Sequence, residues 1–342
     1  MTRRPIRIQG NGRPLLDIFS AGRAGTQSRL HFSRAHIEQI ARTVRRTPEV
    51  MVKVTGGGTS SGSVSAHFAY ISRHGELEIE TDEGERISEE AQKEFLEDWH
   101  LELTAGQYRA GRDGKLDARK AKLVHKIVLS MPAPTPPEKV LAAARNFARE
   151  KFALQHRYAM VLHTDRPHPH VHMVVKAEGE HGRRLHIDKE MLREWREDFA
   201  RMMREQGIAA NATPRVTRGR SKGTTKDPMY RAQRRGASTA LRHQVTSVAR
   251  ELKETGTVRD PSRKKLLETR KAVVDGWIRA ADILDRQGEV SLAGDVRYFA
   301  KHLPPVLTDR ERMAAAILNH LDRRRAALPA EKMRAAEYDT TR

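Results

Sequence analysis

The 342-residue sequence contains no cysteine, which excludes disulfide bonds, zinc ribbons and thiol nucleophiles. Aromatic residues make up only 5% of the chain, so few side chains are available to stack on bases. No segment approaches the roughly 18 consecutive apolar residues that a membrane span requires. The basic N-terminus also lacks the apolar run of a signal peptide, so the sequence predicts a cytoplasmic protein.

Acidic residues are few relative to basic ones, with 44 Asp and Glu against 64 Lys and Arg and a formal net charge of +20. A surplus of this size indicates a polyanionic partner, because neutralised phosphates release counterions. A membrane surface is the competing interpretation, but the basic residues are dispersed and no amphipathic helix with lipid-facing aromatics stands out. The net charge therefore favours nucleic acid as the binding partner over a membrane surface.

Hydrophobic periodicity predicts the elements of one mixed domain. Alternating apolar and β-branched residues predict strands at 49–56, 75–84, 122–132, 156–165 and 169–179, with a further candidate at 183–188. Helical spacing predicts helices at 34–46, 65–75, 88–103, 136–152 and 189–207, with a capping box starting at Ser88. Adjacent hairpins among these strands predict an α+β fold, an antiparallel sheet covered by helices.

Shifts in composition divide the chain into four parts. Residues 1–48 are expected to form a flexible basic arm and a short helix, and residues 49–208 the α+β domain. Residues 209–236 are polar, basic and aperiodic, which is typical of a linker. Residues 237–342 show helical patterns only and are expected to form a helical C-terminal domain.

The segment HTDRPHPHVHMVV carries four histidines within ten residues. His163 ends one predicted strand, and alternation would place His168, His170 and His172 on one face of the next. A hairpin between the strands would bring His163 beside them, and three imidazoles could then hold a divalent metal with open positions for a substrate oxygen. Asp165 is placed to orient a ring N–H or to serve as a base.

Two plainer interpretations of these histidines stand beside the metal site. They could lie on a solvated strand and bind nothing, although four alternating histidines between apolar runs make this an uncommon pattern. They could also form a three-histidine hydrolytic zinc site, since ligand types alone do not separate zinc from manganese or magnesium. No general-base glutamate motif accompanies them, which weakens the zinc hydrolase.

An upstream tyrosine motif followed by an HxDxxHPHxH block resembles the relaxases, the mobilisation nucleases of conjugative plasmids and of the T-DNA-processing type. His170, Val171 and His172 match the HUH signature of that superfamily, and His163 fits the third metal ligand. The resemblance implies an HUH relaxase-like fold and a metal, Mg²⁺ or Mn²⁺ ahead of Zn²⁺, that polarises the scissile phosphate. His168 occupies a position of this subgroup from which it could contact DNA.

The segment HFAYISRHGELEI resembles the tyrosine motif of the same family, with Tyr70 at the position of the nucleophile. Ser72, Arg73 and Gly75 fall in the trailing part of the motif, and Arg73 is a candidate DNA contact. The implied chemistry is attack of a phenolate on phosphorus, which yields a 5′-phosphotyrosine and a free 3′-hydroxyl. Tyrosine ionises near pH 10 without help, so a base or a metal-linked proton path is required.

Other tyrosines compete with Tyr70 for this role. Alternation places Tyr158 in the core, and Tyr108 lies in a polar segment where it could stack on a base. Rolling-circle replication initiators carry their histidines before the tyrosine, so the reverse order found here favours a relaxase over a replication initiator or a transposase.

Candidate DNA contacts lie in two further places. VHKIVLSMP resembles the family's middle motif, in which Ser130 would contact DNA beside the nick, although a hydroxyl at a strand end is also common without function. The basic segment after the α+β domain supplies candidate phosphate contacts, unless it is a solvated linker: Arg215, Arg218, Arg220, Lys222, Arg234 and Arg235.

The sequence thus predicts a metal-dependent relaxase that nicks one strand of plasmid DNA, single-stranded or supercoiled, at an origin of transfer (oriT). The resemblance implies relaxosome accessory proteins and a coupling protein as partners of the helical C-terminal region. Two alternatives stay open. One is a catalytically inactive relaxase-fold regulator that only binds DNA, and the other is a metal-dependent nuclease that uses water.

Overall fold

The computed structural model describes residues 31–102, 121–220 and 239–339. Two compact units divide the chain, one containing Ser33–Thr213 and the other containing Pro214–Arg342. We call the first the sheet unit and the second the helical unit. Each is described by itself below.

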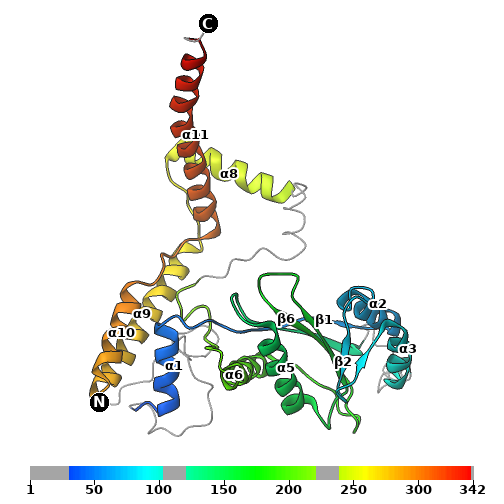
Figure 1. Ribbon diagram of the computed structural model, residues 1–342. Helices are drawn as coiled ribbons and strands as arrows, with labels where there is room; N and C mark the ends of the chain where they lie inside the picture. The colour runs from blue at the N-terminus through cyan, green and yellow to red at the C-terminus, as the bar shows by residue number, and fades with distance from the viewer. Residues whose placement is uncertain (1–30, 103–120, 221–238, 340–342) are drawn as a thin grey trace, which may run out of the picture. The chain divides into compact units, whose positions relative to one another are not determined.

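The sheet unit contains one six-stranded sheet in the order β1-β4-β6-β5-β2-β3, and its neighbouring strands pair antiparallel (Figure 1). This confirms the predicted α+β class. The candidate strand at 183–188 does not form, and only an isolated bridge between Glu178 and Arg184 is present there. The strands are β1 (Met51–Gly58), β2 (Ile79–Thr81), β3 (Arg86–Ile87), β4 (Val124–Ser130), β5 (Tyr158–His163) and β6 (His170–Lys176).

Two long helices, α5 (Pro137–Phe152) and α6 (Lys189–Glu205), cover one face of the sheet (Figure 1). Their aromatic side chains, Phe147, Phe152, Trp195 and Phe199, form edge-to-face ring contacts in a core whose residues are almost entirely buried. The strands contribute alternate residues to this core, including Val171, which lies between His170 and His172 and points to the opposite face.

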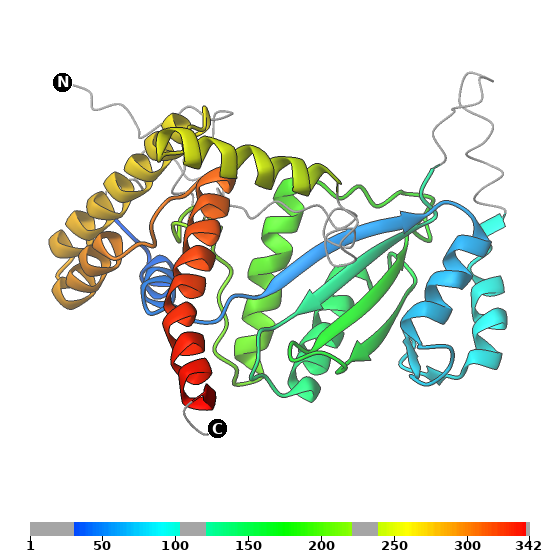
Figure 2. The ribbon, with the colours of Figure 1, turned by 90° about the horizontal axis from the view of Figure 1, so that it is seen from above.

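The described residues cover only part of the opposite face. Helices α2 (Ser61–Ile71) and α3 (Glu89–Asp98) pack there through Phe68, Phe95 and Trp99. Figure 2 shows them at one end of the sheet, with β1, β4 and β6 passing over α5 and α6. The triad of histidines described below lies on this face. A further helix of this unit, α1 (Arg34–Val44), is capped by Ser33.

Two helix starts differ from the predictions. Helix α2 was expected from residue 65 but begins at Ser61, because Ser60 and Ser63 form a reciprocal capping box that ends the glycine-rich strand β1. Helix α3 does start after Ser88, but the predicted capping box is absent, because the Ser88 hydroxyl donates to Glu90 instead of capping a backbone N–H.

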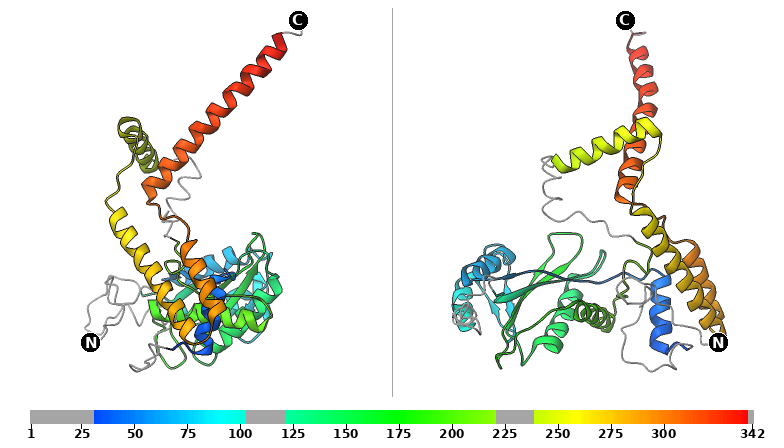
Figure 3. Two further views of the ribbon diagram at one scale, coloured as in Figure 1. Left: turned by 90° about the vertical axis from the view of Figure 1, so that its left-hand side faces the viewer. Right: turned by 180° about the vertical axis from the view of Figure 1, so that it is seen from behind.

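The helical unit confirms the helical C-terminal region. Its helices are α8 (Thr239–Thr255), α9 (Arg263–Arg286), α10 (Val290–Lys301) and α11 (Asp309–Asp339). Helices α9 and α10 lie side by side (Figure 3), joined by the contact between the Trp277 and Phe299 rings. The Trp277 indole N–H donates to the carbonyl of Thr217 at 2.7 Å. Among the described helices, none is both long enough and apolar enough to cross a bilayer.

Candidate metal and nucleophile site

Three histidine rings meet on the partly covered face of the sheet. His163 at the end of β5 pairs in register with His170 at the start of β6, and His172 follows two residues later on the same face. The ring centroids are 4.5–5.1 Å apart, and one nitrogen from each ring can be chosen so that all lie within 4.8 Å of one another. This histidine triad has the donor set of a divalent-metal site.

Backbone carbonyls orient two of the three rings. Nε2 of His163 donates to the carbonyl of Ile71 at 2.6 Å, and Nδ1 of His170 donates to the carbonyl of His168 at 3.1 Å. Each ring then keeps its other nitrogen as a lone-pair donor, the arrangement in which second-sphere carbonyls orient metal-bound imidazoles. At His163 this nitrogen is Nδ1, which lies 3.3 Å from the Arg73 guanidinium and would exchange that contact for the metal. The residues present therefore fit a bound metal ion.

Burial favours the neutral form of two of the three histidines. Burial first, together with the neighbouring His163 and His170, lowers the pKa of His172 to about 3. Burial also lowers the pKa of His163 from its usual value. A neutral imidazole offers the free electron pair that a metal needs, so these two rings suit metal binding at neutral pH.

Arg73 links the tyrosine helix to the triad. Helix α2 ends at Ile71, and Arg73 and His74 then take left-handed backbone conformations with φ of 57° and 55°, which non-glycine residues seldom adopt. The turn directs the Arg73 guanidinium to Asp165 at 2.6 Å and to Nδ1 of His163 at 3.3 Å. Backbone strain at this point thus holds a cation beside the histidines.

Asp165 contacts Arg73 more closely than it contacts the triad. Its second carboxylate oxygen lies 4.0 Å from Nδ1 of His163. Its slight burial acts to raise the pKa of the Asp165 carboxyl, but the charges of Arg73, His163 and His170 outweigh it and hold that pKa below its usual range. A carboxylate of low pKa is a weak proton acceptor, so the geometry favours the orienting role of Asp165 over the role of a base.

Tyr70 lies on the exposed side of α2, with 55% of its surface accessible. The Arg73 guanidinium lies 5.6 Å from the centre of the Tyr70 ring. His67, one helical turn earlier, stacks near it at 6.2 Å and contacts His172 edge-on at 6.5 Å. Tyr70 is therefore connected to the triad from two sides, through Arg73 and through His67.

His67 was not among the residues predicted from the sequence. Burial, and to a smaller extent the positive charge of Lys126, lower the pKa of His67 to about 4. The available signal was its spacing of three residues from Tyr70, which places both on one side of a helix.

The remaining predicted contacts are placed as follows. Ser130 is buried opposite His170 in the β4·β6 register. His168 was expected on the same strand face as the triad, but it precedes β6, and its Nδ1 accepts a hydrogen bond from the Ala133 N–H at 3.1 Å. Pro169 follows directly and removes a backbone donor, so the strand begins only at His170.

The predicted basic contacts are not part of the sheet unit. Arg215 and Arg220 are exposed and Arg218 is partly buried, all in the helical unit. Lys222, Arg234 and Arg235 lie outside the described residues, as does Tyr108. Tyr158 is 3% exposed and lies in the core, as its alternation indicated.

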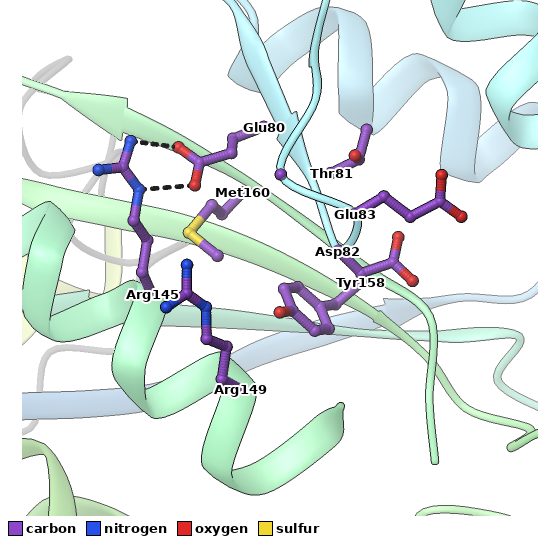
Figure 4. Close-up of a pocket in the computed structure, with 9 residues that line it drawn as sticks. Glu80, Thr81, Asp82, Glu83, Arg145, Arg149, Tyr158 and Met160 are labelled. Carbon is purple, nitrogen blue, oxygen red and sulfur yellow. Dashed lines mark hydrogen bonds and ion pairs between the residues drawn. The ribbon is translucent and has the colours of Figure 1, made fainter. Parts of the chain in front are cut away.

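A second polar hollow, of about 100 Å³, lies away from the triad (Figure 4). Tyr158 lines it at the opposite end of β5 from His163, and Met160 points to the face opposite the triad. Of its two arginines, Arg145 forms a bidentate ion pair with Glu80 at 2.6 and 2.7 Å, and Arg149 lies beside it. It is therefore separate from the site described here.

Comparisons with known proteins agree with this geometry. Residues 70–208 match the family model "Relaxase: MobA/VirD2-like, nuclease domain". The T-DNA border endonuclease VirD2 of Rhizobium radiobacter is 28% identical over 189 residues, covering 50% of this chain and 43% of its own length. VirD2 of Agrobacterium fabrum is 28% identical over 205 residues, covering 55% of this chain and 43% of its own length.

No solved structure matches the chain significantly. The chain spans less than half the length of the curated relatives described above. The family match begins at Tyr70 and includes the whole histidine triad. Residues 70–208 are therefore similar to the nuclease domain of the MobA/VirD2-like relaxases.

Proposed function

We propose that this protein nicks one DNA strand by transesterification, with Tyr70 as the nucleophile. The observation that carries the proposal is that the exposed Tyr70 is joined through Arg73 and His67 to the histidine triad. A nucleophile beside a metal-binding group is what strand transfer requires. The product is a 5′-phosphotyrosyl adduct and a strand ending in a free 3′-hydroxyl.

The covalent step exchanges one phosphodiester for another. Tyr70 loses its phenolic proton, its oxygen forms a bond to phosphorus, and the bond from phosphorus to the 3′-oxygen breaks. The leaving 3′-oxygen takes up a proton, so no net hydrolysis occurs and the strand can be rejoined. Arg73 places positive charge beside the attacking ring, and Asp165 holds that guanidinium in place.

His163, His170 and His172 would hold the divalent ion, with Mg²⁺ or Mn²⁺ favoured over Zn²⁺. A bound ion would offset the negative charge that develops on the phosphate oxygens. The carbonyls of Ile71 and His168 orient two of the imidazoles for this task.

The biological setting we propose is DNA transfer from an oriT-like site, as the names of the matched relatives suggest. In this setting, accessory proteins and a coupling protein would be partners of the helical unit. The basic residues predicted in and beyond residues 215–220 would add phosphate contacts.

A direct test uses the full chain, Mn²⁺ and a labelled pool of single-stranded oligonucleotides with randomised sequence. We expect a slowly migrating, protein-linked band on a denaturing gel, and sequencing of the linked strands would define the preferred nick. Tyr70→Phe should abolish the band, while Tyr298→Phe, which changes an exposed tyrosine of the helical unit, should not.

The other outcomes identify the two alternatives. Cleaved strands without linked protein would indicate a nuclease that uses water. Neither cleavage nor adduct with any pool member or divalent metal, despite DNA binding, would indicate an inactive regulator and contradict the proposal.

A further inference from the structure

On the sheet face that carries the triad, the described residues leave part of β1 and Lys126 of β4 accessible. Burial alternates along β1, with Val50 and Val52 in the core and Met51, Lys53 and Thr55 exposed. Helices α2 and α3 pack on another part of this face, which includes Val124, Val161 and Val174. We call the accessible residues the β1–β4 strip: Met51, Lys53, Thr55 and Lys126. Val128 and Ser130 of β4 point to the same face but are buried.

The strand register connects this strip directly to the triad. His172 on β6 lies opposite Val128 on β4, which in turn lies opposite Lys53 on β1. Two strand spacings place the Lys53 backbone about 10 Å from that of His172. Lys126 is two residues from Val128 and so points to the same face, diagonal to Lys53. Both lysine side chains are long enough to reach a strand held at the triad.

Several cations of the sheet unit are held by carboxylates, whereas the two lysines are not. Arg157 is paired with Asp82 and Asp98, and Lys151 with Asp198. Among the described residues, no carboxylate forms an ion pair with Lys53 or Lys126. Burial lowers the pKa of Lys126, and its charge acts on His67 beside Tyr70. A half-buried cation without a counter-ion is available to an anion that arrives from outside.

We propose that the β1–β4 strip binds single-stranded DNA, with Lys53 and Lys126 each holding a backbone phosphate beside the one at the triad. Met51, which is 44% exposed at the end of the strip, contacts a base. The strip lies along β1, the edge strand of the sheet, so a single DNA strand can follow it with its phosphates toward the two lysines. This inference rests on the proposed function for the identity of the strand.

The salt dependence of binding tests the phosphate contacts. The full chain is titrated with fluorescent oligothymidylate in EDTA at several NaCl concentrations, so that no cleavage contributes. Lys53→Gln and Lys126→Gln should each weaken binding about three- to tenfold at low salt. Each should also reduce the slope of log K against log salt by about 0.7, the value for one phosphate contact to a single strand.

The matched control is Lys139→Gln. Lys139 is an exposed lysine on α5, the helix that covers the other face of the sheet. Its replacement removes the same charge and should leave the slope unchanged. Unchanged slopes for both strip variants, or an equal change for Lys139→Gln, would overturn the proposal.

A second measurement uses the absence of cysteine from the chain. Lys53→Cys and Lys139→Cys each introduce a unique thiol at an exposed position, so both variants are expected to fold. Oligothymidylate should slow maleimide labelling of Lys53→Cys and leave Lys139→Cys unaffected. Protection by duplex DNA but not by the single strand would contradict the assignment to a single strand.

These readouts separate the two proposals because neither depends on cleavage. A chain that forms no covalent adduct but shows the expected slopes and protection would retain the strip and lose the proposed function. A chain that forms the adduct but shows no effect of Lys53 or Lys126 would retain the function and lose the strip.

Discussion

The two faces of the sheet are built from the same strands but have opposite chemistry. On one face, alternate residues of β4, β5 and β6 join α5 and α6 in a closed aromatic and aliphatic core. On the other face, the residues between them include His163, His170, His172 and Lys126, and α2 and α3 cover only part of it. Because successive side chains of a strand point to opposite faces, the same strands supply apolar core residues on one side and polar, reactive residues on the other.

The largest effect on stability is expected on the closed face. Phe147→Ala removes a fully buried ring that contacts Phe152, Trp195 and Phe199, and should lower the free energy of unfolding by about 3–5 kcal/mol. Urea unfolding measures this change. Tyr70→Phe is the control on the open face, where the exposed hydroxyl should matter by less than about 0.5 kcal/mol. Equal losses in the two variants would remove the distinction between the faces.

A smaller free-energy change is expected when a histidine of the triad is replaced, and it should appear as a loss of metal-binding affinity. His172→Ala deletes one of three ligands and should weaken Mn²⁺ binding by about 100-fold, as measured by calorimetry. His181→Ala, at an exposed histidine outside the triad, provides the comparison and should leave the affinity unchanged. Wild-type affinity in His172→Ala would mean that the triad does not hold the ion.

The last expected effect is a pH dependence of stability to which the open face contributes. Counted for one ring over one pH unit, it is the smallest of the three. Burial lowers the pKa of His172 to about 3 and of His67 to about 4, whereas an unfolded histidine titrates near 6.5. Between these values the unfolded chain binds protons that the folded chain does not, so the free energy of unfolding falls as the pH falls from about 6.5 to about 4. Each ring contributes at most about 1.4 kcal/mol per pH unit.

Urea unfolding in EDTA at several pH values measures this slope. His67→Gln should make the slope shallower, because one depressed group is removed. His186→Gln changes a histidine outside the site and should leave it unchanged. If the wild-type protein and His67→Gln show the same slope, His67 is not held neutral in the folded chain.

Much of this architecture was predictable because it depends on local patterns. Alternating apolar residues located β1, β4, β5 and β6, and Pro136 together with helical periodicity located α5. Local patterns gave wrong predictions where a side chain forms its hydrogen bond with a partner that the pattern does not include. Ser88 uses its hydroxyl for Glu90, and His168 accepts a hydrogen bond from Ala133, 35 residues away in the chain.

The amino-acid sequence specifies which reactive groups are available: the alternating histidines and a tyrosine three residues before an arginine, with no thiol. Only the tertiary structure decided which of these groups meet. Antiparallel pairing of β5 with β6 closes the triad, and the left-handed turn after α2 brings Arg73 to Asp165. Antiparallel pairing of β1 with β4, and of β4 with β6, likewise places Lys53 and Lys126 on the face of the triad. Alternation along a strand fixes the sheet face to which each side chain points. The register between strands, which depends on long-range packing, determines which side chains become neighbours.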